Sequence, residues 1–534
     1  MHRRQSRQSY KNMNKKTFIL SSLLAGGLLL GCNDSQLLNQ VNPNQASVST
    51  FWQTEGDAIK GVNAAYSAMQ DRRFSLWIRF LTDVSSDEAY SQSPWTDLGN
   101  LGKFIVTDYN IPMNRESYEA AYQGIYRTSQ VLENVPKIKM DATLQKRILA
   151  EAKVIRAYFY YNMANIWGNV PLVLTSQTPG DRPDQATQAQ VFAQVIKDCM
   201  EAAPDLPETY TGADVGRLHK YSAIALMGKA YMQQRKWTEA AAAFKQIVDQ
   251  VPTRFDLLPD FKDNFTAALE NNKESLFEIQ YYEENRLGFP NYDVAGGSES
   301  SERAQFFGLR NTDGFNGGGW CDGQPTRWLE NQFMKEKDKA GNVDYRLDYT
   351  LFYSGSKLKP YGRTYAEFTA TANGRDFVAG RDRFWIKYTN YFKANDSYFS
   401  GINDRVIRLA DVMLLYAEAL NEQGQTAQGI PFANRVRARV NMTSLPLTLS
   451  QTDFRLQLRH DRVVELAGET QRYWDLKRYG IAGPELAGPN PTQPANVSNF
   501  DTDFRTFIKG KSELYPLPLY ETDANPKLKQ NAGW

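Results

Sequence analysis

Apolar residues recur every three or four positions over much of the chain, which is the spacing of one face of an α-helix. This pattern predicts helices over residues 55–69, 115–135, 142–167 and 187–203. Residues 71–114 interrupt the series, because Asp, Ser, Gly and Pro replace the apolar repeat there. We therefore expect a long excursion between the first helix and the second.

Residues 221–254 carry the most specific internal signal, a match to the 34-residue tetratricopeptide pattern. In that pattern two small residues let a pair of helices cross closely, and aromatic residues fill the space between them. The matching positions are Gly228, Tyr231, Ala240, Phe244 and the terminal Pro252. The segment is therefore predicted to form a tetratricopeptide-type helix pair.

One helix pair cannot bury its own apolar face, so further pairs must stack on it. Weaker matches at residues 115–165 and 406–440 are the candidates. Residues 256–405 lie between the repeats, lack helical periodicity and are rich in Gly, Asn, Asp and aromatic residues. A stretch of loops this long is usually functional. The predicted fold class is mostly α: a tetratricopeptide-like α-α superhelix with a loop-rich, aromatic-rich mid-chain excursion.

The N-terminal segment predicts export. Two lysines precede an apolar run, residues 17–31, that is too short to cross a hydrocarbon core of ~30 Å as a helix. The run ends at a small residue followed by Cys32, which resembles the bacterial lipobox, in which this cysteine is acylated. We expect residues 1–31 to be a lipoprotein signal peptide and residues 32–50 a lipidated tether. An ordinary signal peptide with a chance cysteine is the alternative.

Charge and composition exclude several classes of protein. Six of the 62 Lys and Arg residues lie in the predicted signal peptide, which holds no acid, so the rest of the chain carries 56 bases against 60 acids. This near-neutral chain lacks the basic footprint of a nucleic-acid-binding protein. After the lipobox only Cys199, Cys321, His219 and His460 remain, too few for a disulfide framework or a histidine-based metal site or triad. Aromatic residues make up 13% of the chain, which favours stacking on a ligand.

Several stretches resemble the SusD/RagB family of outer-membrane nutrient-binding lipoproteins, in the same order along the chain. Three are long: RAYFYY to WGNVPL at 156–172, RVVELAGE to RYWDLKR at 462–478, and YPLP to NPKLKQNAGW at 515–534. Two are short: RLAD at 408–411 and NRVRAR at 434–439. The C-terminal stretch departs slightly from the family pattern, with Ala and Trp where Pro and Tyr are common.

The resemblance implies one helical body over residues 51–534 with about four tetratricopeptide-like helix pairs. The repeats would occupy about 51–255 and 406–480, and the ligand region about 256–405. It also implies a lipid anchor at Cys32 in the outer membrane, facing outward. Such a protein captures oligosaccharide, or peptide in some members, for a TonB-dependent SusC-like transporter partner. Neither catalysis nor a cofactor is implied.

Two further patterns indicate structural roles. Glu465, Glu469, Arg472 and Asp475 are three or four positions apart, which predicts a charged ladder along a helix rather than a catalytic carboxylate pair. Aromatic residues of the first resemblance stretch recur at helical spacing and are expected in the core, as are the two remaining cysteines. These core residues are Tyr158, Phe159, Trp167, Cys199 and Cys321.

Two loops combine aromatic rings with polar groups, as a sugar-binding surface requires. Residues 79–100 and 281–320 also correspond to the regions that hold ligand contacts in the family. The expected ligand-binding residues are Asp83, Trp95 and Asn100 in the first loop and Tyr292, Phe315 and Trp320 in the second. Pro94 and nearby serines leave Trp95 without a helix face on which to be buried. An alternative for Trp320 is that it fills a cavity beneath its glycine-rich loop.

The sequence leaves the ligand and the function class open. A peptide-binding member of the same family is one alternative, although the density of rings in the mid-chain favours sugars. A surface glycoside hydrolase is less favoured, because no isolated acid pair lies in a ring-lined loop. A scaffold that binds only proteins through its helix pairs is a further alternative.

Overall fold

The computed structural model describes residues 51–91, 93–178, 180–283, 299–309, 319–370, 383–392, 400–486 and 506–534. The predicted signal peptide, the tether and Cys32 lie outside the described residues. The chain divides into two units, Met1–Gln53 and Thr54–Trp534. Only residues 51–53 of the first unit are described, and there the rings of Phe51 and Trp52 meet edge to face. Everything below concerns the second unit.

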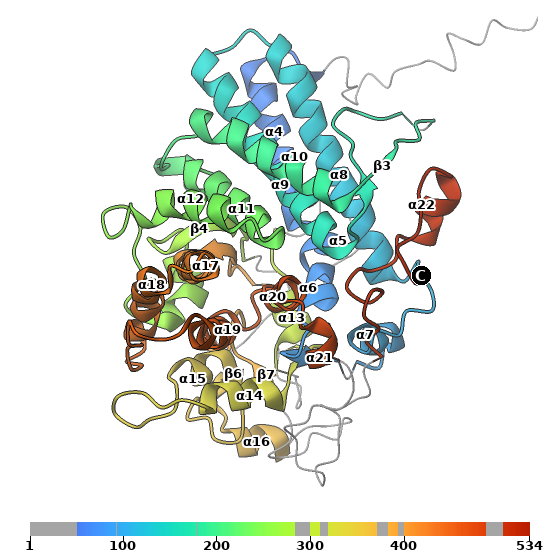
Figure 1. Cartoon of the computed structure of the whole chain (residues 1–534). Coiled ribbons are helices and arrows are strands. Elements are labelled where there is room, and N and C mark those ends of the chain that lie inside the picture. Colours follow the sequence, from blue (N-terminus) through green and yellow to red (C-terminus); the bar gives the residue numbers. More distant parts are fainter. Residues whose placement is uncertain are drawn as a thin grey trace, which may run out of the picture. The chain divides into compact units, whose positions relative to one another are not determined.

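In the described residues, eight helices stack in chain order, each packed against the helix before it and the helix after it (Figure 1). They are α4 (Glu55–Gln70), α8 (Pro112–Asn134), α9 (Ala142–Ile166), α10 (Gln188–Ala202), α11 (Lys220–Gln233), α12 (Trp237–Val248), α17 (Leu409–Glu422) and α18 (Thr426–Arg439). The predicted mostly α superhelix is confirmed, and the helices expected from apolar periodicity agree with these bounds to within a few residues.

Helices α11 and α12 form the predicted tetratricopeptide pair. A Cβ atom at Gly228 would lie 2.4 Å from the ring of Phe244, so this helix crossing requires glycine. If the other stacked helices are grouped in the same way, two consecutive helices to a pair, the eight form four pairs: α4–α8, α9–α10, α11–α12 and α17–α18. The candidate pair at 406–440 is α17–α18. The candidate at 115–165 instead spans the second helix of one pair and the first helix of the next.

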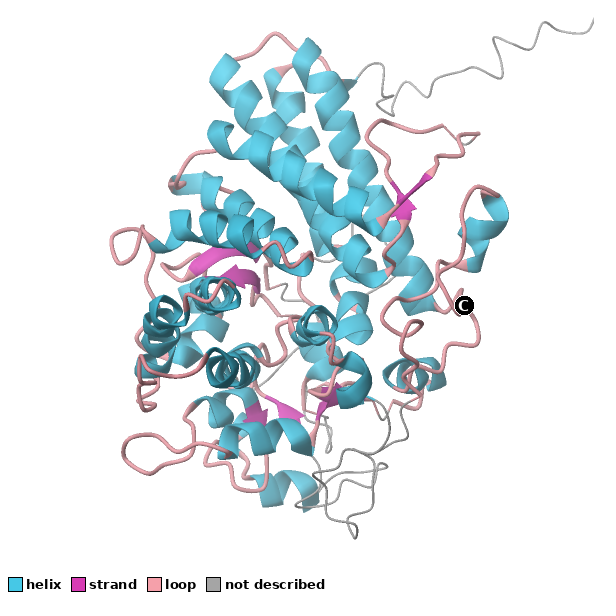
Figure 2. Cartoon of the chain, viewed as in Figure 1, coloured by secondary structure: helices cyan, strands magenta, loops and turns pink. Residues whose placement is uncertain are grey.

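A two-stranded antiparallel sheet joins the two ends of the mid-chain excursion. Strand β4 (Ser275–Ile279) pairs with β8 (Asp404–Arg408), and the Leu409 N–H donates to the Glu274 carbonyl over 2.8 Å (Figure 2). Because the chain leaves and re-enters the superhelix at the same sheet, α12 can pack directly on α17. The excursion is therefore an insertion between two stacked helix pairs.

Short elements make up the rest of the described chain. The helices are α5 (Arg72–Ser75), α6 (Trp77–Thr82), α7 (Thr96–Gly102), α13 (Arg303–Phe307), α14 (Arg327–Met334), α15 (Arg346–Thr350), α16 (Tyr365–Ala370), α19 (Gln451–Leu466), α20 (Arg472–Tyr479), α21 (Ala482–Leu486) and α22 (Leu519–Ala524). The strand pairs are β1 (Ala89–Tyr90) with β5 (Gln324–Pro325), β2 (Val170–Pro171) with β3 (Gln185–Ala186), and β6 (Leu351–Phe352) with β7 (Phe384–Trp385). The 3₁₀ turns are η1 (Val135–Lys137), η2 (Ala203–Asp205), η3 (Gly212–Asp214), η4 (Phe261–Phe265), η5 (Ala267–Leu269) and η6 (Pro360–Gly362).

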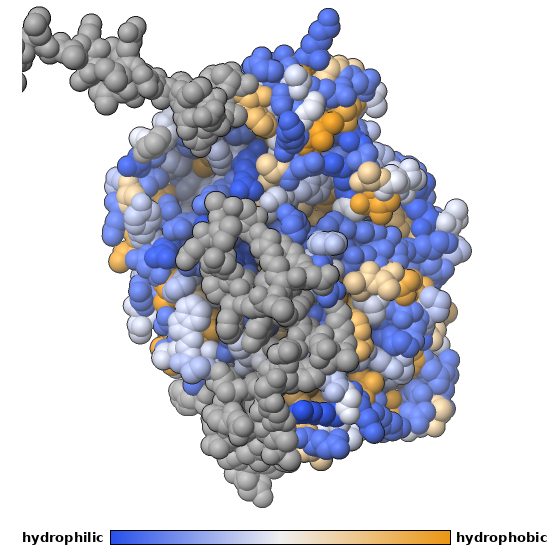
Figure 3. Space-filling view, turned by 180° about the vertical axis from the view of Figure 1, so that it is seen from behind, coloured by the Kyte–Doolittle hydropathy of each residue, from blue (hydrophilic) through white to orange (hydrophobic). Residues whose placement is uncertain are grey.

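The core runs through the superhelix and into the insertion. The predicted core residues are confirmed: Tyr158, Phe159, Trp167, Cys199 and Cys321 are all buried. On the face shown in Figure 3, the visible described surface is mostly hydrophilic, with apolar residues scattered among polar ones. Among the described helices, none is both long and apolar enough to span a membrane.

Candidate functional site

Four aromatic side chains from two distant parts of the chain are in contact, and we call them the aromatic cluster. Trp77 on α6 meets Trp95 edge to face with ring centroids 5.8 Å apart, and it meets Phe306 of α13 at 5.6 Å. Phe306 in turn contacts Trp320 at 4.8 Å. Trp77 and Phe306 are buried, Trp320 is half-buried, and Trp95 is 38% exposed. The cluster thus runs from the core to the surface.

Backbone pairing brings these two parts of the chain together. Strands β1 and β5 place Ala89 opposite Pro325, and the Thr326 N–H donates to the Glu88 carbonyl at 2.9 Å. The Trp320 N–H donates to the Gln305 carbonyl at 2.5 Å, which fixes Trp320 against α13. Trp95 of the first predicted loop and Phe306 and Trp320 of the second therefore belong to one cluster, although more than two hundred residues separate the two tryptophans.

Polar groups surround the cluster. The indole N–H of Trp77 donates to Glu116 at 2.8 Å, and that of Trp95 faces Asp97 at 3.3 Å. The Arg72 guanidinium lies 5.7 Å from the Trp77 ring centroid, and its Nη1 is 3.7 Å from Oε2 of Glu302. Burial raises the pKa of Glu302 to about 7, although the charge of Arg72 opposes this shift.

The structure brings Trp95 and Trp320 together through the two buried rings between them. Asn100 lies on the same short helix that Trp95 precedes; it is half-buried, and its carbonyl accepts from the N–H groups of Lys103 and Ile105. Tyr292 and Phe315 lie outside the described residues. Trp320 packs against the core and is only half-buried, so it has a face in the cluster and a face outside it.

Asp83 lies in the interior rather than at the surface. It is 2% exposed, and its Oδ1 accepts from the Thr470 N–H at 3.0 Å. Burial raises its pKa, while the charges of Arg79 and Arg303 oppose the shift. Because it faces inward, we leave it out of the proposed binding surface.

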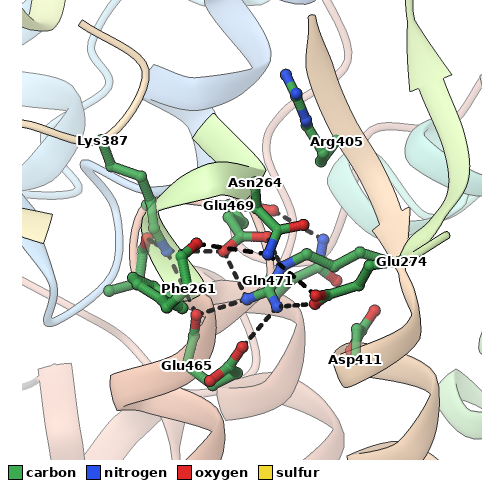
Figure 4. Close-up of polar contacts among 12 residues, drawn as sticks. Phe261, Asn264, Glu274, Lys387, Arg405, Asp411, Glu465, Glu469 and Gln471 are labelled. Atoms are coloured by element: carbon green, nitrogen blue, oxygen red, sulfur yellow. Dashed lines mark hydrogen bonds and ion pairs between the residues drawn. The ribbon is translucent and has the colours of Figure 1, made fainter. Parts of the chain in front are cut away.

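The acidic residues of the C-terminal resemblance stretch belong to a buried ion network, shown in part in Figure 4. Glu465 accepts from Arg346 at 2.9 Å, from Arg408 at 2.5 Å and from Arg439, and Glu469 accepts from Arg408 at 2.8 and 2.9 Å. Burial alone would raise the pKa of Glu465, but the three guanidiniums hold it well below its usual value. The members of this buried ion network are Glu274, Arg346, Lys387, Arg408, Arg439, Glu465 and Glu469.

The predicted charged ladder along one helix is wrong in its geometry, although the residues are ion-paired as expected. Helix α19 ends at Leu466 and α20 begins at Arg472, because Gly468 and Thr470 adopt left-handed conformations with φ of 68° and 61°. The charged residues therefore face different partners: Arg472 binds Asp87 in a bidentate pair at 2.8 and 2.7 Å, and Asp475 binds Arg462 and Arg478.

Sequence reasoning missed two residues at the cluster. Trp77 lies within an apolar run, as a core residue does, and it is buried, but it also packs against the exposed indole of Trp95. Arg72 carried no sequence signal beyond its charge. Tyr282, a further ring in the second predicted loop, is 71% exposed, and its N–H donates to the Glu299 carbonyl at 2.7 Å. Within the described ranges, no three His, Cys, Asp or Glu side chains are grouped as a metal ion would require.

The fold and the site define an α-helical repeat protein with a loop-built aromatic surface. Three family models match the chain: "SusD family" over residues 273–534, "Starch-binding associating with outer membrane" over 78–232, and "Tetratricopeptide repeat" over 225–253. The chain belongs to the SusD/RagB family. The tetratricopeptide match coincides with α11 and α12, as the sequence predicted.

Similar proteins are related over nearly their whole length. SusD-like protein P2 of Formosa agariphila is 26% identical, covering 97% of this chain and 98% of the relative. A SusD-like protein of Bacteroides ovatus is 25% identical, covering 92% and 90%. Among solved structures, a SusD superfamily protein of Bacteroides vulgatus aligns with a TM-score of 0.76 at 24% identity, covering 91% of this chain and 100% of the other. A laminarin-binding SusD-like protein aligns with a TM-score of 0.73 at 27% identity, covering 90% and 100%.

Proposed function

We propose that this protein binds oligosaccharide at the aromatic cluster and delivers it to a TonB-dependent outer-membrane transporter. One observation carries the proposal: Trp95 and Trp320 come from distant loops, yet two buried rings link them into one cluster. An indole that is 38% exposed and supported from behind by another indole can receive a flat sugar face.

The chemistry around the cluster suits hydroxyl-rich ligands. Sugar rings present apolar C–H faces for stacking and a rim of hydroxyls that need hydrogen-bond partners. Asp97 lies beside the Trp95 indole, and the Arg72 guanidinium lies over Trp77. Such contacts are individually modest, which allows the release that delivery to a transporter requires.

Family membership supports the same proposal from outside the site. The family model that matches residues 78–232, which include Trp95 and Asn100, is described as starch-binding and associated with the outer membrane. The 27% identical structural neighbour binds laminarin, a glycan. We therefore favour glycan over peptide as the ligand.

A glycan and peptide array on the purified chain, with Trp95→Ala beside the wild type, tests the proposal. We expect glycan binding that the variant weakens by roughly tenfold, because one stacked ring is lost. Tyr520→Ala, which removes a ring that is 63% exposed on α22, is the matched control and should bind as the wild type does. Binding to peptides alone, or glycan binding unchanged in Trp95→Ala, contradicts the proposal.

The proposed location is the outer face of the outer membrane, with Cys32 as the acylated anchor. Acyl chains contribute about 0.8 kcal/mol per buried CH₂, so two or three chains hold the body at a membrane. Cys32→Ala should leave glycan affinity in solution unchanged and move the protein from the membrane fraction to the soluble fraction. Membrane retention of that variant would contradict the anchor.

We propose binding without catalysis. The closely spaced acids Glu465 and Glu469 are fully engaged by guanidinium and ammonium groups, so neither is available as a general acid or a nucleophile. Incubation with any bound oligosaccharide should return it intact on chromatography. A shorter product would support the glycoside hydrolase alternative instead.

A further inference from the structure

A cavity of about 220 Å³ lies where the turn between α11 and α12 meets α17, α19 and α20. Its polar lining is dominated by guanidinium groups. Four arginines border it, Arg235, Arg455, Arg459 and Arg478, together with two carboxylates, Glu418 and Glu422. The aromatic cluster contributes no residue to this lining.

Each carboxylate is already engaged by one arginine. Arg455 binds Glu422 in a bidentate pair at 2.6 and 3.0 Å. Arg478 binds Glu418 through both oxygens, with Nη2 to Oε2 at 2.7 Å. Bidentate pairs of this kind satisfy both partners. The two acids therefore have no further charge with which to neutralise the other two arginines.

Arg235 and Arg459 are left without a carboxylate partner among the described residues. Arg235 is exposed and uses only its Nε, which donates to the Arg478 carbonyl at 2.8 Å. The Nε of Arg459 is buried and has no hydrogen-bond acceptor in the structure. Glu485 lies near enough to interact electrostatically with Arg459 but forms no ion pair with it. A buried donor without an acceptor is costly and marks a place that a ligand can satisfy.

Aromatic rings complete the cavity. The guanidiniums of Arg459 and Arg478 each lie 4.4 Å from the Tyr479 ring centroid, which fixes their orientation. Trp237, at the start of α12, is half-buried and also borders the cavity. An indole beside uncompensated guanidiniums suits a sugar ring that carries an oxyanion.

We propose that this cavity is a second ligand site, for the oxyanion of an acidic sugar residue, either the carboxylate of a uronic acid or a sulfate ester. Guanidinium groups prefer both oxyanions for the same reason, because their planar N–H pairs match two acceptor oxygens. The volume is smaller than that of a typical drug-sized pocket, so it suits one sugar residue rather than a chain.

Isothermal titration calorimetry on the full chain at low ionic strength tests this proposal. The probes are D-glucuronate, D-glucose 6-sulfate, D-glucose and sodium sulfate, and the variants are Arg459→Gln and Arg235→Gln. Neither arginine holds a carboxylate, so both variants should keep the wild-type melting temperature. Lys236→Gln is the matched control, since Lys236 is exposed and adjacent in sequence but does not border the cavity.

We expect glucuronate or glucose 6-sulfate to bind at least tenfold more tightly than glucose. Each cavity variant should weaken that binding at least tenfold, and Lys236→Gln should change it less than twofold. Raising the salt concentration should weaken the acidic probes and not glucose. Trp95→Ala should leave acidic-sugar binding intact, so the failure of this site and of the aromatic cluster can be told apart.

Three outcomes would overturn the proposal. The first is that neither acidic sugar binds the folded wild type at millimolar concentration. The second is that Arg459→Gln, with an unchanged melting temperature, binds as the wild type does. The third is that sodium sulfate binds as tightly as glucose 6-sulfate, which would show that the cavity holds a bare anion and not a sugar.

Discussion

The buried ion network consists of charged residues and the aromatic cluster of aromatic rings, and both kinds of side chain can either stabilise a fold or bind a ligand. In this protein the network is structural, whereas the cluster reaches the surface. In the network, Glu465 and Glu469 accept from several cationic donors each and are almost fully buried. In the cluster, exposure rises from Trp77 to Trp95, so one ring remains available to a ligand. A side chain that is buried and has all of its charges and hydrogen bonds paired is therefore structural, whereas an exposed one is available to a ligand. Burial and pairing distinguish the two roles better than the type of residue does.

Glu465→Gln should have the largest effect, because it removes the carboxylate that three arginines share. Arg346, Arg408 and Arg439 would remain buried with too little negative charge near them. We expect the free energy of unfolding to fall by about 5 kcal/mol, at the upper end for breaking buried ion pairs. Chemical denaturation followed by circular dichroism measures this loss.

The matched control for that variant is Glu201→Gln, the same substitution in a surface pair with Lys153 and Lys197. Its effect should stay below about 1 kcal/mol, as for exposed ion pairs in general. If both variants lost similar stability, the network would be no more structural than the surface, and the comparison with the cluster would fail.

Trp77→Ala should damage both stability and binding, because this ring belongs to the core and supports the exposed indole. We expect a loss of about 3–4 kcal/mol in the free energy of unfolding, typical of a large aromatic residue replaced in a core. Glycan affinity should fall as well, since Trp95 loses its edge-to-face partner. Trp77→Phe, which keeps a ring and loses the hydrogen bond to Glu116, should retain most of the affinity. Full glycan affinity in a destabilised Trp77→Ala would mean that Trp95 needs no support.

The superhelix was predictable because its signals are local. Apolar residues three or four positions apart, and Gly228 facing Phe244, are determined within a few turns of helix. The charged ladder could not be predicted correctly, because two left-handed residues, Gly468 and Thr470, end the helix in the middle of a regular charge pattern. A non-glycine residue at positive φ leaves no reliable mark in a sequence.

The aromatic cluster was predictable only in part. Both loops could be chosen for their composition, and Trp95 and Trp320 do come together through buried rings. The contact between Trp77 and Phe306 depends on strands β1 and β5 pairing across the insertion, and strands of two residues have no sequence signature. The inward direction of Asp83 was hidden for the same reason, since its partner Thr470 lies far along the chain.

Trp320→Ala tests a residue between the structural and the binding class, because its side chain is half-buried. If it belongs to the binding surface, as we propose, glycan affinity should fall roughly tenfold while the melting temperature changes by only a few degrees. Differential scanning fluorimetry and titration of the same preparation measure both quantities. A large drop in melting temperature with unchanged affinity would show instead that the indole fills a cavity beneath its loop.

Glu302→Gln should have the smallest effect, and it tests whether the rim of the cluster is less well paired than the network. Burial raises the pKa of Glu302 to about 7 from an ordinary 4.5, so between these values the folded chain keeps a proton that the unfolded chain releases. Stability should therefore fall as the pH rises from about 5 to 7, and the variant should lack this part of the fall. We expect the pH-dependent loss of stability to be about 1 kcal/mol larger in the wild type than in the variant. This is less than the free energy equivalent of the whole pKa shift, because the partly exposed Arg72 can approach the carboxylate and stabilise its charge. The pKa of the half-buried Glu270 is also raised to about 7, so the informative quantity is the difference between the two proteins at pH 5 and pH 8. Equal pH dependence in both would mean that Arg72 already compensates Glu302 as fully as the arginines of the network compensate Glu465.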